Sequence, residues 1–152
     1  MRTFVLAVGR MRRGPLLELQ AEYAKRLVPA PAITEVEERR KLPDAALKAR
    51  EAELILATVP AGARLVALDP GGVAWSSRDL AGHLAAWRDR GLGAVAFAIG
   101  GAAGHGDAVL ARADTRLSLG AMTWPHLLAR IMLLEQLYRA QQILAGHPYH
   151  RE

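Results

Sequence analysis

The segment Ala94-Val-Ala-Phe-Ala-Ile-Gly-Gly101 decides the fold class of this chain. Six apolar residues in succession predict a strand that is covered on both faces, because a half-exposed strand would alternate apolar and polar side chains. Such strands are typical of the centre of a parallel sheet. The segment therefore favours an α/β fold, with the glycines marking the carboxyl end of a central strand.

Four further strands are predicted on either side of this segment, at 3–8, 33–37, 64–68 and 116–119. Asp69-Pro-Gly-Gly72 is expected to stop the third of them. Amphipathic stretches between the strands predict helices, and a long final helix follows Pro125. This alternation predicts one α/β domain over residues 1–152, with a mostly parallel five-stranded sheet and helices on both faces.

Composition excludes several classes of protein. The chain has 152 residues and no cysteine, so disulfides, thiolate zinc sites and cysteine nucleophiles are ruled out. It has no apolar run near the ~18 residues of a membrane span, so we expect a cytoplasmic protein without a membrane partner. No metal is expected either, because His147 and His150 have no acidic cluster beside them. His83 and His105 are interpreted as ordinary surface or loop histidines.

Positive charge is concentrated in the first third of the chain. Residues 1–50 hold 11 Lys/Arg against 6 Asp/Glu, and this excess of five equals the net charge of +5 for the whole sequence. Arg10, Arg12 and Arg13 follow the first predicted strand, and 39–41 (Arg-Arg-Lys) follow the second. If the strands are parallel, both clusters lie at one edge of the sheet, where they would suit a phosphate backbone. The alternative is a solvated basic face.

Three loops at the same edge predict a ligand site. Leu68, Gly100 and the segment 120–125 each lie just past the carboxyl end of a predicted strand, where open parallel sheets bind ligands. Glycine lets a ligand approach the backbone closely, because it has no Cβ. The glycines follow the fourth strand, so they are not a dinucleotide fingerprint. A tight turn without a ligand is the alternative interpretation.

The final helix and the terminal segment predict contacts beyond a simple monomer. Leu127, Ile131, Leu134 and Tyr138 form an apolar line that neighbouring leucines widen, so the helix needs cover on two sides. A second copy of the chain would supply one side, whereas a core helix of a monomer is the alternative. The ending 147–152 (His-Pro-Tyr-His-Arg-Glu) has the composition of an arm that folds over a ligand.

The chain resembles the RlmH family of SPOUT-class methyltransferases over essentially its whole length. The resemblance rests on 65–69, Ile99-Gly-Gly101, Ala121-Met-Thr-Trp-Pro-His126, Leu137-Tyr-Arg-Ala140 and the terminal hexapeptide. It implies a homodimer with a C-terminal trefoil knot that methylates N3 of a pseudouridine in 23S ribosomal RNA, within the assembled ribosome. The cofactor implied is S-adenosylmethionine, held by Leu68, Gly100, Gly120, Ala121, Met122, Thr123, Trp124 and Pro125.

Residue chemistry then suggests roles in this reaction. His150 would take the N3 proton, Arg151 would hold phosphate or the developing anion, and Tyr149 would pack on the base or the cofactor. His126 would shape the pocket. One departure from the family is that Ala102 and Ala103 stand where the family's glycine loop usually has Pro-Glu. The alternatives are a non-catalytic dimeric RNA- or ribosome-binding protein of this fold and a SPOUT methyltransferase acting on another base.

Overall fold

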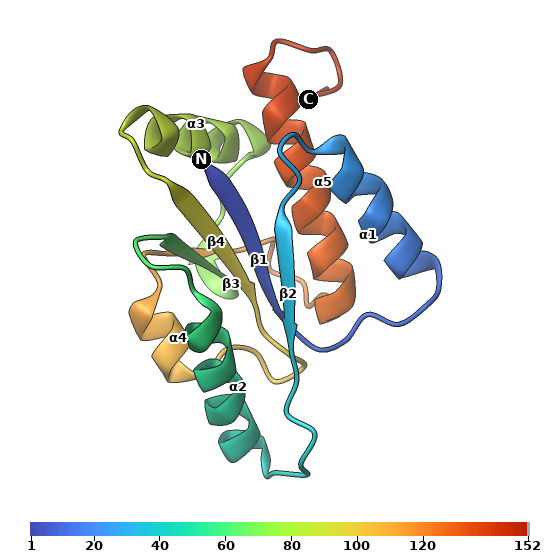
Figure 1. Cartoon of the computed structure of the whole chain (residues 1–152), viewed down its shortest axis with the longest axis vertical. Helices are drawn as coiled ribbons and strands as arrows, with labels where there is room; N and C mark the ends of the chain where they lie inside the picture. Colours follow the sequence, from blue (N-terminus) through green and yellow to red (C-terminus); the bar gives the residue numbers. More distant parts are fainter. Residues whose placement is uncertain (152) are drawn as a thin grey trace.

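The computed structural model describes residues 1–151. Five strands alternate with five helices along the chain (Figure 1). The strands are β1 (Arg2–Val8), β2 (Ala32–Val36), β3 (Arg64–Val73), β4 (Ala94–Ile99) and β5 (Thr115–Leu117). The helices are α1 (Pro15–Arg26), α2 (Asp44–Thr58), α3 (Ser77–Asp89), α4 (Asp107–Arg112) and α5 (His126–Leu144).

The strands form one sheet in the order β2-β1-β4-β3-β5, and every neighbouring pair is parallel. The predicted α/β class and parallel sheet are therefore confirmed. β4 occupies the centre, and its residues 95–99 are buried, as the unbroken apolar run requires. Because all strands run the same way, the loops that follow β1, β2, β3, β4 and β5 meet at one edge of the sheet (Figure 1).

Helices cover both faces of the sheet. α2 and α4 pack on one face, where Leu6, Ile55 and Leu65 belong to a buried cluster. α1, α3 and α5 lie on the other face, and α5 packs between α1 and α3 (Figure 1). Of the predicted apolar line of α5, Leu134 is buried there with Phe97 of β4 and Tyr138 is partly buried, whereas Leu133, Leu137 and Ala140 complete the buried face of the helix. Among residues 1–151, no helix combines the length and the hydropathy needed to cross a bilayer.

The expected end of the third strand is wrong. β3 does not stop at Asp69 but reaches Val73, with a shift in register between Leu68 and Val73 opposite Leu117. This is a bulge, in which extra residues loop out and pairing then resumes. Gly72 permits it, because a Cβ at this position would lie 2.5 Å from the backbone of Arg116. The glycines that look like a strand terminator therefore let two backbones approach closely.

Candidate functional site

A cavity of about 160 Å³ lies at the carboxyl edge of the sheet. It brings together six of the eight residues predicted to hold the cofactor: Leu68, Gly100, Gly120, Met122, Thr123 and Trp124. Ala121 and Pro125 belong to the same loop but do not line the cavity. His126, the predicted pocket-shaping residue, lines it together with Asp69, which sequence reasoning did not single out.

Glycine is required at the floor of this cavity. A Cβ on Gly100 would lie 2.8 Å from the carbonyl carbon of Gly104 and 3.0 Å from the amide nitrogen of His105. Gly104 donates its N–H to the carbonyl oxygen of Gly101 at 2.9 Å, which closes the turn. Gly120 has φ +118°, a conformation that side chains disfavour. The glycine turns therefore expose bare backbone to one part of a cavity that is otherwise lined by side chains.

His105 lies in the loop after the glycine turn, as one part of its interpretation expected, but it is not an ordinary surface residue. Its side chain is buried, and its Nε2 lies 3.0 Å from the carbonyl oxygen of Ala98 in β4. Burial lowers the pKa of His105, and the contact with Ala98 opposes this only in part. The His105 ring thus links the end of β4 to the turn that follows it.

This burial predicts a loss of stability in acid. The pKa of His105 is lowered in the fold from its ordinary 6.5, so below about that pH the unfolded chain binds a proton that the fold excludes. The free energy of unfolding should therefore fall with decreasing pH, by up to about 1.4 kcal/mol per pH unit for this group. Urea unfolding of the wild type and His105→Gln between pH 8 and 5 measures it. The variant should show a flatter profile, and an unchanged profile would contradict the prediction.

A buried cation stands behind the cavity, one helical turn after His126. The side chain of Arg130 is 1% exposed, and its Nη1 donates to Glu35 Oε2 at 2.6 Å and to Gln20 Oε1 at 3.1 Å. Its Nη2 donates to the carbonyl oxygen of Gly9 at 3.1 Å. Burial alone would raise the pKa of Glu35, but the hydrogen bonds from Arg130 and from the N–H of Met11 outweigh it and lower that pKa. Sequence reasoning missed Arg130, although a lone charge amid 127–134 was a usable signal.

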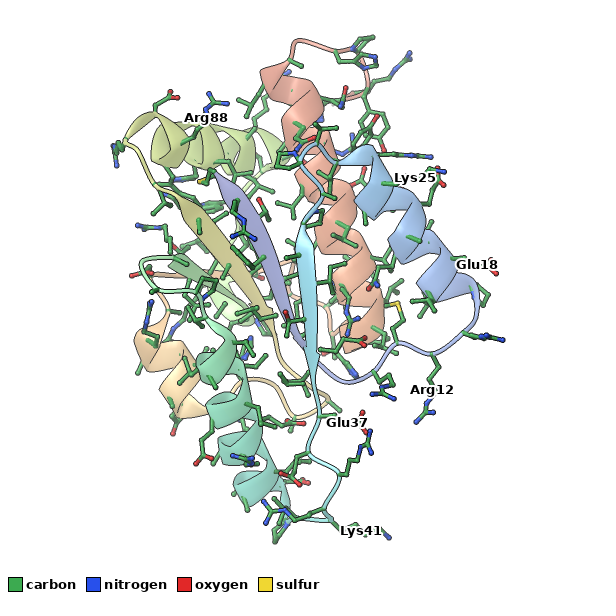
Figure 2. All side chains as sticks on the ribbon, viewed as in Figure 1. Arg12, Glu18, Lys25, Glu37, Lys41 and Arg88 are labelled. Carbon is green, nitrogen blue, oxygen red and sulfur yellow. The ribbon has the colours of Figure 1, made fainter. Side chains whose placement is uncertain are left out.

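The two basic clusters lie at the edge of the sheet that carries the cavity, as the parallel strands require. Arg12 and Lys41 project from this edge, whereas Arg88 lies at the opposite end of the molecule (Figure 2). Arg12, Arg13, Arg39 and Lys41 are exposed, and none forms an ion pair with a carboxylate of residues 1–151; Arg40 instead pairs with Glu38 at 2.9 Å. The hydrogen bonds from Arg40 hold the pKa of Glu38 at about 2.

The terminal segment folds back on the other half of α5. Tyr149 donates its hydroxyl to Glu135 Oε1 at 3.2 Å, and its ring meets Tyr138 edge-on at 4.8 Å. His150 Nδ1 lies 3.4 Å from Arg139 Nη1, and Arg139 pairs with Glu135. Glu135 and Arg139, which contact the terminal segment, lie 9 and 13 residues after His126, about 14 and 20 Å along the helix. Within one chain the structure therefore does not bring Tyr149 and His150 to the cavity; Arg151 is exposed.

A second, larger hollow of about 600 Å³ adjoins the folded-back segment. Leu19 and Tyr23 of α1 line it with Met132 and Glu135 of α5. Its wall is mostly apolar, and Glu135 at its border is the residue that holds Tyr149. Met122, above the first cavity, is 74% exposed. Leu19 in the hollow and Met122 above the first cavity are thus exposed apolar side chains, which contact with another chain would cover.

The described residues 1–151 contain no group of three or more His, Asp or Glu side chains able to hold a metal ion. The arrangement thus consists of a cavity with glycine turns in its wall, a basic rim and a terminal segment that carries a histidine and an arginine. Chemically, it can hold a small ligand against the sheet edge and attract a polyanion to the rim.

Comparison with known proteins adds independent findings. Residues 1–150 match the family described as "Predicted SPOUT methyltransferase". A protein of Paramagnetospirillum magneticum named "Ribosomal RNA large subunit methyltransferase H" is 57% identical over 151 residues, which are 99% of both chains. A protein of the same name from Rhodospirillum rubrum is 58% identical over the same share of both chains.

Solved structures show the same fold at low identity. A probable methylase family protein from Haemophilus influenzae has a TM-score of 0.61 and 13% identity, covering 99% of this chain and 70% of that one. A putative methyltransferase from Legionella pneumophila, solved with the bound cofactor SAM, has a TM-score of 0.50 and 16% identity, covering 92% and 66%.

Proposed function

This chain belongs to the SPOUT methyltransferase family, and from that membership we propose that it methylates large-subunit ribosomal RNA with S-adenosylmethionine as the methyl donor. The observation that carries the proposal is full-length identity of 57% and 58% to two proteins named for that activity. The cavity at the carboxyl edge of the sheet is the cofactor site, and the basic rim is the RNA side of the same edge. We place the protein in the cytoplasm, together with ribosomes.

The residues that line the cavity fit this cofactor. Leu68, Leu117 and Leu119 supply an apolar wall for the flat adenine, and the glycine turns leave the backbone accessible to its polar edge. Asp69 supplies a carboxylate that suits the amino group or a ribose hydroxyl. A volume of about 160 Å³ is small beside the ~300–1,000 Å³ of ordinary ligand sites. A further wall is therefore needed.

A second copy of the chain supplies that wall and the terminal arm. The same chain's tail is anchored about 14 to 20 Å from the cavity along α5, beside the larger apolar hollow. In a two-fold dimer, the surfaces around this hollow would cover each other. The arm at residues 147–152 of one protomer would then close the cavity of its partner, which places catalytic candidates from one chain at the cofactor of the other.

We propose N3 of a pseudouridine as the target atom. The cofactor, when bound, supplies a methyl group that is already electrophilic because its sulfur is positively charged. What the protein must add is alignment of the target and removal of the N3 proton. His150 takes this proton through an imidazole nitrogen, Arg151 holds phosphate or the developing negative charge, and Tyr149 packs against the base. His126 shapes the cavity wall from the start of α5.

The test is the ribosomal RNA of a strain that lacks the gene. Nucleoside analysis should show loss of one methylated pseudouridine from the large-subunit RNA, and purified protein should restore it on ribosomes from that strain. Calorimetry with S-adenosylmethionine accompanies this test. A silent titration together with unchanged nucleosides would favour a non-catalytic RNA-binding protein, and loss of a different methylated base would point to another target.

The basic rim gives a separate prediction about RNA affinity. Replacing Arg12 and Arg13 by Gln should weaken binding to the ribosome and lower the slope of log affinity against log salt by about 1 to 2, because two phosphate contacts are lost. The matched control removes two positive charges from the opposite end with Arg88→Gln and Arg90→Gln, both exposed. Filter binding between 50 and 300 mM salt measures both. If the two variants had equal slopes of log affinity against log salt, the basic rim would not take part in RNA recognition.

A further inference from the structure

Arg130 is the charged residue that the fold buries most deeply, at 1% exposed, among those described. Its guanidinium reaches three acceptors on three different segments: Gly9 after β1, Gln20 in α1 and Glu35 in β2. Burying a cation is costly unless its hydrogen bonds are satisfied. The three acceptors satisfy the hydrogen bonds of the guanidinium. An apolar side chain, however, would fill the same space without needing any hydrogen-bond partner. The charge therefore calls for a functional explanation.

The segments that Arg130 joins all border or contact the loop 9–14 between β1 and α1. Gly9 begins this loop, and Glu35 also accepts the N–H of Met11 at 2.8 Å. The N–H of Gly9 in turn binds the carbonyl oxygen of Val36 at 2.8 Å. Through Glu35 and Gly9, the buried guanidinium therefore fixes the backbone on both sides of Arg10. The loop carries Arg12 and Arg13, which project into solvent at the rim.

The same loop contacts the wall of the cofactor cavity. Gly9 has φ +97°, and a Cβ at this position would lie 2.9 Å from Nε2 of His126. His126 lines the cavity and precedes Arg130 by four residues, so the two side chains share one face of α5. Burial, and then the charge of Arg130, lower the pKa of His126. One buried group thus contacts the basic loop and stands behind the cavity wall.

We propose that Arg130 is a positioning residue, which holds the arginines of loop 9–14 in place beside the cofactor cavity so that they can bind the RNA. The inference rests on the proposed function and deepens it. Arg130 does not touch RNA or cofactor; it acts through Gly9, Glu35 and the loop between them. Its loss should therefore impair use of RNA much more than binding of the cofactor.

The test compares Arg130→Lys and Arg130→Met with the wild type on ribosomes from a strain that lacks the gene. We expect KM for the ribosome to rise about 10- to 100-fold in Arg130→Met, because a displaced loop loses its contacts with RNA phosphates, and to rise less in Arg130→Lys, which keeps the charge. The dissociation constant for S-adenosylmethionine should stay within about threefold of the wild type. Hydrogen exchange of the peptide 9–14 should quicken in the same order, since the N–H of Met11 loses its fixed acceptor.

Two further variants keep the proposal testable if Arg130→Met does not fold. Glu35→Gln removes the charge of a partner that is 31% exposed, and it should raise KM with a smaller loss of stability. Arg112→Gln breaks the 3.2 Å ion pair with Asp114 beside α4 and serves as the control, with unchanged KM. The inference is wrong if a folded Arg130 or Glu35 variant uses ribosomes with wild-type KM, or if cofactor affinity falls as much as KM rises. An inactive wild type would instead refute the proposed function.

Discussion

Removing residues 147–152 is expected to abolish methylation while the chain still folds and still binds S-adenosylmethionine. The segment carries His150 and Arg151, and loss of a positioned general base alone costs roughly 10²- to 10⁴-fold in rate. The truncation leaves in place both the lining of the cavity, which lies within residues 68–129, and the proposed wall from the partner, and it removes only the arm that closes the site. Single-turnover methylation of ribosomes, with calorimetry of the cofactor on the same preparation, measures both expected results.

The single substitution His150→Ala separates the base from the arm. It should reduce the rate nearly as much as the truncation, and cofactor affinity should change little. His83→Ala is the matched control, because His83 lies on α3, stacked on Trp75 and outside the cavity. A truncated chain that methylates at the wild-type rate would remove the arm from the mechanism. A fully active His150→Ala variant would dismiss only the proposed base.

Gly100→Ala is expected to have the opposite effect, with loss of cofactor binding as the primary defect. Its Cβ would lie 2.8 Å from the carbonyl carbon of Gly104, so the turn 101–104 would have to open. Such overpacking costs about 1–3 kcal/mol, which corresponds to roughly a 5- to 150-fold rise in the dissociation constant for S-adenosylmethionine. Calorimetry measures this rise directly.

Gly82→Ala provides the control for Gly100→Ala. Gly82 lies within α3, and a Cβ there would meet nothing within 4 Å. The substitution should leave cofactor affinity unchanged and stabilise the fold by up to about 1 kcal/mol, since alanine is a better helix former. If Gly100→Ala bound the cofactor as tightly as Gly82→Ala, the glycine turn would not be part of the cofactor site.

Local pattern in the sequence was sufficient to predict the sheet. The apolar run 94–99 and the alternation of strands with helices specify a parallel sheet, and a parallel sheet brings its following loops to one edge. The grouping of Leu68, Gly100 and 120–125 at that edge follows from topology alone. The bulge at 69–72 was missed because glycine and proline look the same in the sequence whether they end a strand or let pairing resume beyond a loop.

Long-range contacts account for what the sequence could not reveal. Arg130 meets partners 95, 110 and 121 residues away, and no local pattern encodes such a set. His105 is buried by the turn that it supports, and a lone histidine has no periodicity to show this. The arm packs on Glu135, Tyr138 and Arg139 of its own α5, and its proposed place at a partner's cavity is not encoded in any local pattern. The trefoil knot stays a prediction of the resemblance, because strand order and pairing do not specify how a chain is threaded.

Mixed dimers show directly whether the arm of one protomer completes the cofactor site of its partner. Gly100→Ala has an intact arm and a defective cavity, and the chain truncated after Gly146 has the reverse. When the two chains are unfolded together and refolded in equal amounts, half of the dimers should contain one chain of each kind. Each of these mixed dimers has one complete site and one defective site. At a cofactor concentration below the wild-type dissociation constant, where both parents are nearly inactive, we predict recovery of about a quarter of wild-type methylation. No recovery, with mixed dimers confirmed by mass spectrometry, would contradict the account.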